Sequence, residues 1–517
     1  MTDTTHVATD ANIEGEYIPK SFQFERDMDG SNLESREDYL QFEKDANNHY
    51  LAQKIEDVLD GKKQFKPLAD MIKDFQAVQK ERLEVLEDYS NGENWTILHG
   101  RKRLEEEKAD YRIRHDFAGK ASRFFTGYDF GKPVTIGSDE NTDNLKPIVD
   151  FNNYNNIEAL NMELGYDVSR FGRAFELHYR DSEKTDAVVL IDVKEMFTIR
   201  SADARKEIIG AVHCPIYNGK MIVTVYTNDK TYTFKQSDSN SIKLVLDGEP
   251  KKHDYGMVPV VEWQANRGRF GDWEKGIPLI DAYDSAESDT ANYMSDLNDA
   301  LLVIKGDLNA AGLTATDAEK MKKANMLLLE SGITVNGAQT SLDAGYIYKQ
   351  YDVAGTEAYK TRLLRDFYSV IGLIDVANDS TIGANSGIAI QYKLIDLQQV
   401  SAFKKGFYTK SLRRRYRLLE NVHNKLNEES IEADNLTFTF HQNLPTDVWA
   451  EIKSAVDSGM EISQETFQET ASFTDKDKER QRLLNDTVSL TASEEERAFL
   501  TGGLNEQETA RTPSETV

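Results

Sequence analysis

Cysteine is almost absent from this sequence of 517 residues. The single thiol, Cys214, excludes an intramolecular disulfide framework and cannot supply a zinc site built from several cysteines. It follows His213 in the strand-like stretch IIGAVHCPIY, and neighbouring strand residues point to opposite faces, so the two make a poor metal-binding pair. We expect Cys214 to be a packed core thiol. We predict no metal site and no cofactor.

Long apolar runs and excess positive charge are also missing. No stretch approaches the roughly 20 apolar residues that a membrane helix needs, and the first 17 residues resemble no secretory signal. We therefore expect a cytosolic chain without a membrane partner. The formal net charge is -27, and such a chain repels nucleic acid as a whole. That charge is still compatible with a protein that touches DNA without holding it.

Catalytic motifs are the third absence. The stretch GYDFGKPV at 127–134 lacks the spacing of a phosphate-binding loop, and Pro133 stands where a magnesium-binding Ser or Thr is needed. The nine histidines form no HExxH motif, and no GxSxG turn for a nucleophilic serine occurs. We assign no catalytic residue and predict that the chain is not an enzyme.

The periodicity of apolar residues predicts an α+β fold that is predominantly helical. Helical spacing extends over 36–135, and short runs rich in β-branched residues within 165–263 predict an antiparallel sheet or small barrel. These runs are 174–180, 187–192, 196–200, 210–217, 220–227 and 230–236. Helices are expected again at 277–304, 318–328, 355–375 and from 387 to about 427, and NLTFTFH is expected to form a strand. Residues 1–35 form a polar, acidic stretch that we expect to be flexible, and 506–517 are expected to be disordered.

The segment 277–304 contains no lysine or arginine. At roughly 100° per residue its aspartates share an arc of about 140° opposite an apolar side. An ordinary solvated helix mixes lysine with glutamate, although a plain surface helix in an acidic protein is the alternative interpretation. We predict an acidic wall that a polyanion slides past, formed by Asp281, Asp284, Asp289, Asp296 and Asp299.

The second half of the long helix has the opposite character. A basic run in a chain of charge -27 needs a partner, which is either nucleic acid or the acidic surface of a neighbouring copy. Acidic residues are abundant and packing residues such as Leu412 and Tyr416 interleave the run, so we favour the neighbouring copy. The basic residues are Lys404, Lys405, Lys410, Arg413, Arg414, Arg415 and Arg417.

A small, nearly uncharged stretch precedes that helix at 376–386. Glycine-rich turns at helix starts often bind phosphates, but here the chemistry of a nucleotide site is missing. Asp379 is its only charge, and its other polar residues offer neutral hydrogen bonds. We predict that it touches DNA through Asn378, Ser380, Thr381, Gly383, Asn385, Ser386 and Gly387. No ATP site is found elsewhere, so a separate ATPase would supply the energy for any movement.

Several segments, in this order, resemble the portal proteins of tailed bacteriophages, specifically the siphovirus-type family of long-tailed phages of Gram-positive bacteria. The most specific is MVPVVEW at 257–263 followed by GDWEKGIPLIDAYDSAESDTANYMSD at 271–296. The others are LEDYSNGENWTIL (86–98), RIRHDFAGKASRFFTGYDFGKPVTI (112–136), GRAFELHYRD (172–181), NSGIAIQYKLIDLQ (385–398) and GMEISQETF (459–467).

The resemblance implies a portal fold and its domain order. After the arm at 1–35 come a wing at 36–276, a stem of two helices at 277–304 and 355–375, and a clip at 305–354 between them. A tunnel loop at 376–386, a long wing helix at 387–430 and a helical crown at 431–505 follow, ahead of the tail at 506–517.

The resemblance also implies a function. About twelve copies would form a ring at one capsid vertex, assembled in the host cytoplasm, as the channel for packaging and ejecting double-stranded DNA without sequence specificity. Implied partners are the terminase large subunit, the major capsid and scaffolding proteins, and later a head-tail connector protein. Another structural or scaffold-type virion protein is the first alternative, and a phage nucleic-acid enzyme is the second.

Overall fold

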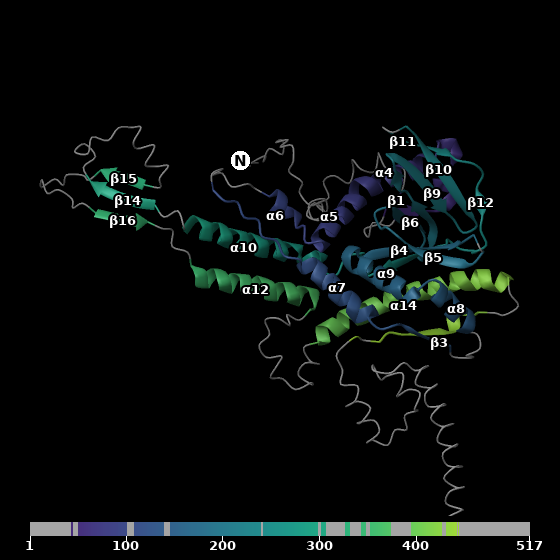
Figure 1. Cartoon of the computed structure of the whole chain (residues 1–517). Helices are drawn as coiled ribbons and strands as arrows, with labels where there is room; N and C mark the ends of the chain where they lie inside the picture. Colours follow the sequence, from purple (N-terminus) through teal and green to yellow (C-terminus); the bar gives the residue numbers. More distant parts are fainter. Residues whose placement is uncertain are drawn as a thin grey trace, which may run out of the picture. The chain divides into compact units, whose positions relative to one another are not determined.

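The computed structural model describes residues 43–44, 50–100, 108–138, 145–182, 184–238, 241–297, 301–306, 326–330, 343–347, 352–373, 394–426, 431–441 and 443. Its fold is α+β, as predicted (Figure 1). We call the described residues 43–276 and 394–443 the body, and the helices α10 (Ile277–Leu297) and α12 (Val353–Ile371) the helix pair.

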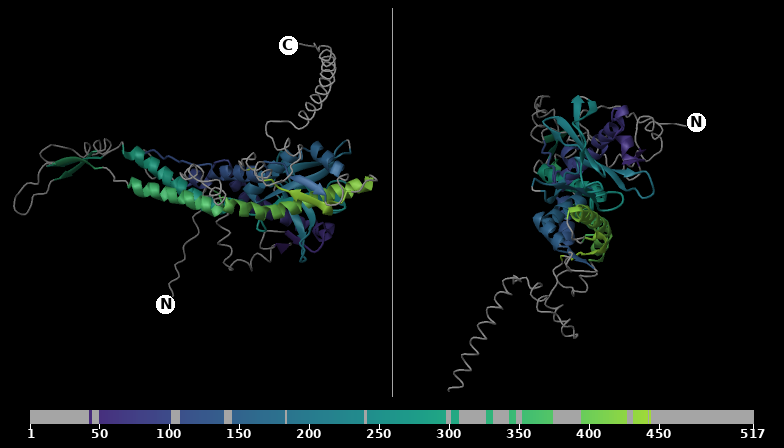
Figure 2. Two further views of the ribbon diagram at one scale, coloured as in Figure 1. Left: turned by 90° about the horizontal axis from the view of Figure 1, so that it is seen from below. Right: turned by 90° about the vertical axis from the view of Figure 1, so that its right-hand side faces the viewer.

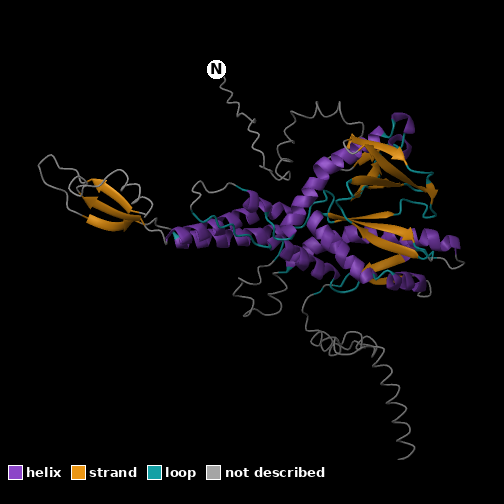
Figure 3. Ribbon diagram, turned by 45° about the horizontal axis from the view of Figure 1, so that its top comes forward, coloured by secondary structure: helices purple, strands orange, loops and turns teal. Residues whose placement is uncertain are grey.

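Short helices pack around the strands of the body (Figure 3). The side chain of Asp116 caps one of them, α7, by accepting a 2.9 Å hydrogen bond from the Gly119 amide. Gly172 ends another, α9, with φ of +75°, and a Cβ there would lie 2.2 Å from the Arg269 carbonyl oxygen. The helices are α3 (Ile55–Val58), η1 (Gly61–Lys63), α4 (Lys66–Asp74), η2 (Phe75–Lys80), α5 (Glu81–Ser90), α6 (Trp95–His99), α7 (Phe117–Phe130), α8 (Lys146–Tyr154), α9 (Ile157–Phe171), η4 (Glu274–Gly276) and η6 (Ala433–Asn435).

The larger sheet of the body has the order β1-β2-β6-β7-β9-β10-β11, with β8 beside β9 and β12 beside β10. All pairs of neighbouring strands in this sheet are antiparallel except β2 with β6. The predicted antiparallel sheet is therefore confirmed for the other strand pairs. Its strands are β1 (Glu43–Lys44), β2 (Tyr50–Ala52), β6 (Met196–Ser201), β7 (Ile208–His213), β8 (Ile216–Tyr217), β9 (Lys220–Tyr226), β10 (Lys230–Asp238), β11 (Ser241–Leu246) and β12 (Lys251–Lys252).

A smaller antiparallel sheet has the order β13-β4-β5, formed by β13 (Val260–Gln264), β4 (Arg173–Arg180) and β5 (Asp186–Ile191). Six consecutive residues of β4 are buried, because α9 covers one face and the other faces the core beneath the larger sheet. This sheet therefore lies at the centre of the body.

The long helix α14 (Ile395–Leu426) packs along β13. After it, β17 (Leu436–Thr439) pairs antiparallel with β3 (Thr135–Ser138). The strand predicted in NLTFTFH is thus confirmed, and it belongs to the body rather than to a separate crown. The N-terminal arm, the remainder of the predicted crown and the C-terminal tail lie outside the described residues.

The two members of the helix pair run antiparallel (Figures 1 and 2). Ile277 and Ile280 of α10 share a core cluster with Phe367 and Ile371 of α12, near the body. No helix among the described residues is long and apolar enough to span a membrane.

Three strands that lie between α10 and α12 in the sequence form a separate mixed sheet. The strand β14 (Leu301–Gly306) pairs parallel with β15 (Met326–Glu330) and antiparallel with β16 (Asp343–Ile347). The prediction of a helix through residue 304 is therefore wrong, as is the helical assignment of 326–328. Short apolar runs such as LLVI fit a strand as well as a helix, and here strand pairing decides between them.

Candidate functional site: the helix pair and the inner face of the long helix

One side of α10 forms a polar seam with the segment that leads from α5 to α7. Tyr89 Oη donates a 2.7 Å hydrogen bond to Asp281 Oδ1, and His115 Nδ1 lies 2.7 Å from Asp284 Oδ1. Asn94 Nδ2 donates to the other oxygen of Asp284. One turn further, Ser288 Oγ accepts a 2.9 Å hydrogen bond from the Ile113 amide. The seam fixes the rotation of α10 against the body.

The predicted acidic wall is corrected by these contacts. Asp284 is fully buried and Asp281 is half-buried, so neither can contribute its carboxylate to an outer face. Asp289 is exposed and Asp296 is partly exposed, whereas Asp299 lies outside the described residues. Residues at positions i, i+3 and i+7 of a helix lie on the same side. On α10 the polar residues Asp281, Asp284 and Ser288 have this spacing, and their side faces the body. The exposed acidic stripe is therefore narrower than predicted.

Burial raises the pKa of Asp281 to about 6, even though its hydrogen bonds from Tyr89 and Thr96 act in the opposite direction. The neighbouring carboxylate of Asp284 adds to the rise. An unfolded aspartate has a pKa near 3.9, so the folded protein binds this proton more tightly than the unfolded chain does. The stability that this group contributes is present below about pH 4 and is lost as the pH rises through about 6.

Replacing Asp281 with asparagine should therefore raise the thermal midpoint at pH 7.5 and flatten the fall in stability between pH 4 and pH 6.5. The amide oxygen still accepts the hydrogen bond from Tyr89, while the cost of a buried charge is removed. The expected gain at pH 7.5 is on the order of 1 kcal/mol. Calorimetry at several pH values measures it, with Asp289→Asn as the exposed control. Parallel pH profiles for wild type and Asp281→Asn would contradict this assignment.

Next to this seam, α10 meets α12 through a charge pair as well as the apolar cluster. Lys360 of α12 is buried, and its Nζ lies 3.0 Å from Glu287 Oε1 and 2.5 Å from Glu357 Oε1. Nearer the body, Gly276 has no room for a side chain, because a Cβ would lie 2.8 Å from the Phe367 ring. Both contacts hold the two helices in register.

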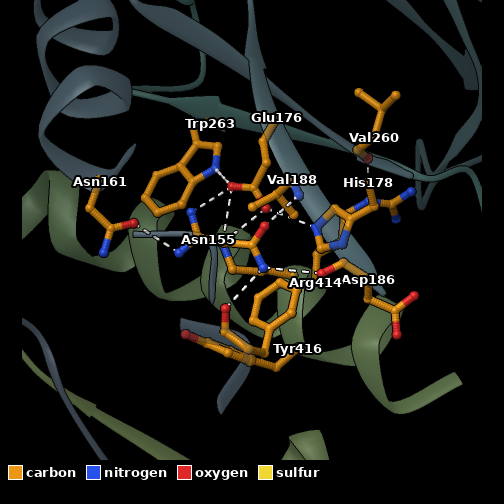
Figure 4. A network of polar contacts seen from close by, with 12 residues as sticks. Asn155, Asn161, Glu176, His178, Asp186, Val188, Val260, Trp263, Arg414 and Tyr416 are labelled. Atoms are coloured by element: carbon orange, nitrogen blue, oxygen red, sulfur yellow. Dashed lines mark hydrogen bonds and ion pairs between the residues drawn. The ribbon is translucent and has the colours of Figure 1, made fainter. Parts of the chain in front are cut away.

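The inner face of α14 carries a buried guanidinium, that of Arg415, at the centre of the body. Figure 4 labels three residues that contact it, Glu176, Trp263 and Asn161. Arg415 donates from Nε and a terminal nitrogen to the carboxylate of Glu176 on β4, at 2.9 and 2.5 Å. Trp263 Nε1 and His178 Nε2 donate to the same carboxylate, at 3.1 and 2.8 Å, and Arg415 also donates to Asn161 Oδ1. Burial alone would raise the pKa of Glu176, but Arg415 and His178 outweigh it and hold it at about 2.

A second buried cation, Lys404, lies three turns before Arg415 on the same face. Its Nζ is 3.1 Å from Asp129 Oδ2 of α7 and 2.9 Å from Asp272 Oδ2, and it also packs over the Phe125 ring. Ser169 Oγ donates a 2.7 Å hydrogen bond to Asp272. Burial would lower the pKa of Lys404, but the two carboxylates outweigh it and raise this pKa. The cluster therefore ties α14 to α7 and α9.

The predicted intersubunit role of the basic run is wrong for three of its residues. Lys404 and Arg415 are paired within this chain, and Arg414 donates to the carbonyl oxygens of Val258 and Val260 at 2.9 Å each. Their partners are 130 to 280 residues away in sequence or are backbone atoms. Lys405 is half-buried near the Tyr128 and Phe440 rings. Only the exposed Lys410, Arg413 and Arg417 face outward, and Arg417 pairs with Asp434.

Buried arginines on other elements form a cluster that the sequence did not reveal. Arg82 binds both oxygens of Glu274, while Arg200 and Arg269 each approach Glu262 to 2.6 Å. Arg173 is buried beside them, and burial together with the positive charges of Arg269 and Arg82 lowers its pKa to about 9. These arginines lie in stretches of mixed composition, such as NRGRFGD around Arg269, so the sequence offers no pattern that marks them as buried.

Of the remaining predicted residues, the structure describes Cys214 but not the stretch expected to touch DNA. The nearly uncharged stretch 376–386, together with Gly387, lies outside the described residues. Cys214 is buried, as predicted, and burial raises the pKa of its thiol to about 12. Within the described part of the chain, no group of three or more His, Cys, Asp or Glu side chains is placed to hold a metal ion.

The chain is similar to a protein family, to a relative in sequence and to solved structures. A family model described as phage portal protein, SPP1 Gp6-like, matches residues 70–489. The portal protein of Bacillus phage SPP1 is 24% identical over 327 residues, which cover 59% of this chain and 62% of that protein, so the match spans less than two thirds of the relative. A chain of the solved structure titled "Neck of empty GTA particle computed with C6 symmetry" matches 71% of this chain and 88% of its own length, at 11% identity and a TM-score of 0.36.

Proposed function

The chain belongs to the SPP1 Gp6-like family of phage portal proteins, which are structural components of the virion and not enzymes, and on this premise we propose that it forms the DNA channel of a capsid. About twelve copies, assembled in the host cytoplasm, form a ring at one capsid vertex. Double-stranded DNA passes through the ring during packaging and ejection, and no base sequence is read. The ring docks the terminase large subunit first and a head-tail connector protein later, and it contacts the major capsid and scaffolding proteins.

The observation that carries this proposal is the charge of α10. Its 21 residues include no lysine or arginine. Asp289 is exposed, Asp296 is partly exposed, and the partly exposed Asp281 and Glu287 are engaged by Tyr89 and Lys360. DNA affinity is dominated by cations that neutralise phosphates, and a wall without cations gives passing DNA nothing to bind. Repeated around a ring, α10 forms a negative lining. The exposed cations of the helix pair, Arg362 and Arg365, belong to α12 and not to α10.

The direct test is electron microscopy of the purified full-length chain. The expected result is a closed ring with a central hole wide enough for duplex DNA. A chain that stays monomeric at micromolar concentration, or that forms assemblies without a hole, would overturn the proposal.

Replacing Asp289 and Asp296 with lysine should make the channel retain DNA. The change gives phosphates two cations per copy, so retention should rise and should weaken again as salt is added. Filter binding of linear duplex DNA to assembled rings, at several salt concentrations, measures the effect. The matched control reverses two exposed acids in turns between strands of the larger sheet, Asp229→Lys and Glu249→Lys. If rings of wild type and of the α10 variant retain equal amounts of DNA, α10 does not form a negative lining of the channel.

Deleting residues 379–385 tests the proposed tunnel loop. We expect ring assembly to persist and DNA packaging to be impaired, because the stretch contacts DNA during translocation. Particle counts by microscopy and encapsidated DNA per particle separate the two effects. Normal packaging by the deletion variant would show that this stretch is dispensable.

A further inference from the structure

The outer face of α14 combines positive charge with exposed apolar side chains. Lys410 and Arg413 are exposed, and within the described residues neither makes an ion pair or a side-chain hydrogen bond. On the same side, Phe403 is 60% exposed and Ile395 is 42% exposed. Asp396 is the exposed acid nearest the start of the helix. We call Ile395, Phe403, Lys410 and Arg413 the basic face.

The outer face of α8 and α9 has the complementary character. Three exposed acids lie there among three exposed large apolar side chains, and Lys146 at the start of α8 is the only exposed cation of the two helices. Within the described residues, none of these three acids is held in an ion pair. We call this set the acidic face: Val149, Asp150, Tyr154, Glu158, Met162 and Glu163.

The two faces of one copy cannot meet each other. The helices contact through their inner sides, where Arg415 donates to Asn161 and Tyr416 donates to Asn152. At 3.6 residues per turn, Lys410 lies roughly 140° around α14 from Arg415. Met162 and Glu163 lie roughly 100° and 160° around α9 from Asn161. Because the helices contact through these inner sides, their outer faces point away from one another.

We propose that the basic face of one copy packs against the acidic face of the next copy around the ring. This pairing rests on the ring of the proposed function and specifies which surfaces close it. Two different surfaces that meet head to tail generate a ring when the rotation between copies closes. Opposite charges fix the register, while the exposed aromatic and aliphatic side chains of both faces supply apolar area to bury.

A second copy fits this pair of surfaces better than nucleic acid does. DNA could approach the basic face only, and the aliphatic and aromatic side chains there offer nothing to a phosphate backbone. The acidic face repels DNA and still exposes three large apolar side chains. A second copy of this chain accounts for both faces with one contact.

Charge reversal in two separate variants tests the pairing. The basic-face variant carries Lys410→Glu and Arg413→Glu, and the acidic-face variant carries Asp150→Lys and Glu163→Lys. Glu158 is kept because it stabilises the first turn of α9. Each variant alone places like charges across every contact, so the concentration needed for half-assembly should rise about tenfold or more. Mass photometry and native mass spectrometry of the full-length chain measure assembly.

An equimolar mixture of the two variants should assemble again. In the mixture every contact between unlike copies joins opposite charges, so rings should contain even numbers of subunits with the two variants alternating. The control variants are Lys251→Glu with Lys252→Glu, and Asp229→Lys with Glu249→Lys, which reverse exposed charges on the larger sheet and should assemble like wild type. A mass tag on one variant makes the alternation visible.

The outcomes separate the two proposals. If wild type forms no ring, the proposed function fails. If wild type forms rings and the face variants do so at the same concentration, or if their mixture does not assemble better than either alone, the face pairing is wrong while the ring stands. Loss of assembly in the control variants would also overturn the pairing. Should a variant lose its circular dichroism signal, Lys410→Gln with Arg413→Gln replaces it, with a smaller rise in the half-assembly concentration expected.

Discussion

Replacing Arg415 with methionine should lower the free energy of unfolding by about 3–5 kcal/mol, because removal of one partner of a buried ion pair leaves the other charge uncompensated. Glu176 would keep its contacts with Trp263 and His178 but would lose both charge-assisted hydrogen bonds from the guanidinium. Methionine fills much of the vacated space, so a cavity is not the main cost. Denaturant unfolding followed by tryptophan fluorescence measures the loss.

Arg417→Met is the matched control, since Arg417 is exposed two residues later on the same helix and lies outside the proposed basic face. Its expected effect is within about 1 kcal/mol, because its ion pair with Asp434 is exposed. The double variant Glu176→Gln with Arg415→Met should recover a large part of the loss, because it removes the stranded charge while the side-chain amide still accepts hydrogen bonds. If Arg415→Met lowers the free energy of unfolding by less than about 1 kcal/mol, the prediction is wrong, because Glu176 then becomes neutral at little cost.

Replacing Lys404 with methionine should destabilise the protein by a similar amount at pH 7, and less at pH 5. The substitution leaves Asp129 and Asp272 buried with no cation between them. Burial already raises the pKa of Asp272 in the wild type, and without Lys404 this pKa must rise further. A carboxyl whose folded pKa is raised contributes stability that is present at low pH and is lost as the pH rises through that pKa. The difference between wild type and variant therefore grows from pH 5 to pH 7.

Thermal unfolding at both pH values measures this difference, and Lys425→Met, at an exposed position of the same helix outside the basic face, is the control. Adding Asp272→Asn to the Lys404 variant should restore part of the stability and remove most of the pH dependence. If Lys404→Met loses the same stability at pH 5 and pH 7, packing over the Phe125 ring, rather than charge, is what Lys404 supplies.

Patterns that depend on near neighbours in the chain were readable from the sequence. The run AFELHYR predicted a strand, and β4 occupies Arg173–Arg180. The repeat of apolar residues after 355 predicted a helix, and α12 follows it closely. The order of motifs also identified the portal family, because it depends on many positions and not on any one contact.

The partners of charged residues were not readable in the same way. The basic run of α14 is plain in the sequence, yet Glu176, Asp129 and Asp272 lie far from it along the chain. One signal was available: Lys404, Ser411 and Arg415 recur on the same helical stripe as Tyr408, Leu412 and Tyr416, all of which are buried. A charged residue that lies on the same side of a helix as the buried apolar residues is expected to have an ion-pair partner within the same chain. The same reasoning applies to Asp284 and Ser288 on α10.

The pairing of β17 with β3 has a consequence for how the chain is made. Leu436 lies opposite Ser138, about 300 positions earlier, so this contact is among the most non-local in the described fold. A ribosome releases the helix pair and the strands β14 to β16 before it has made β17. Until then β3 is an unpaired edge that is open to other chains. Synthesis to residue 439 therefore marks the earliest moment at which a copy can complete its body and enter assembly without exposing that strand.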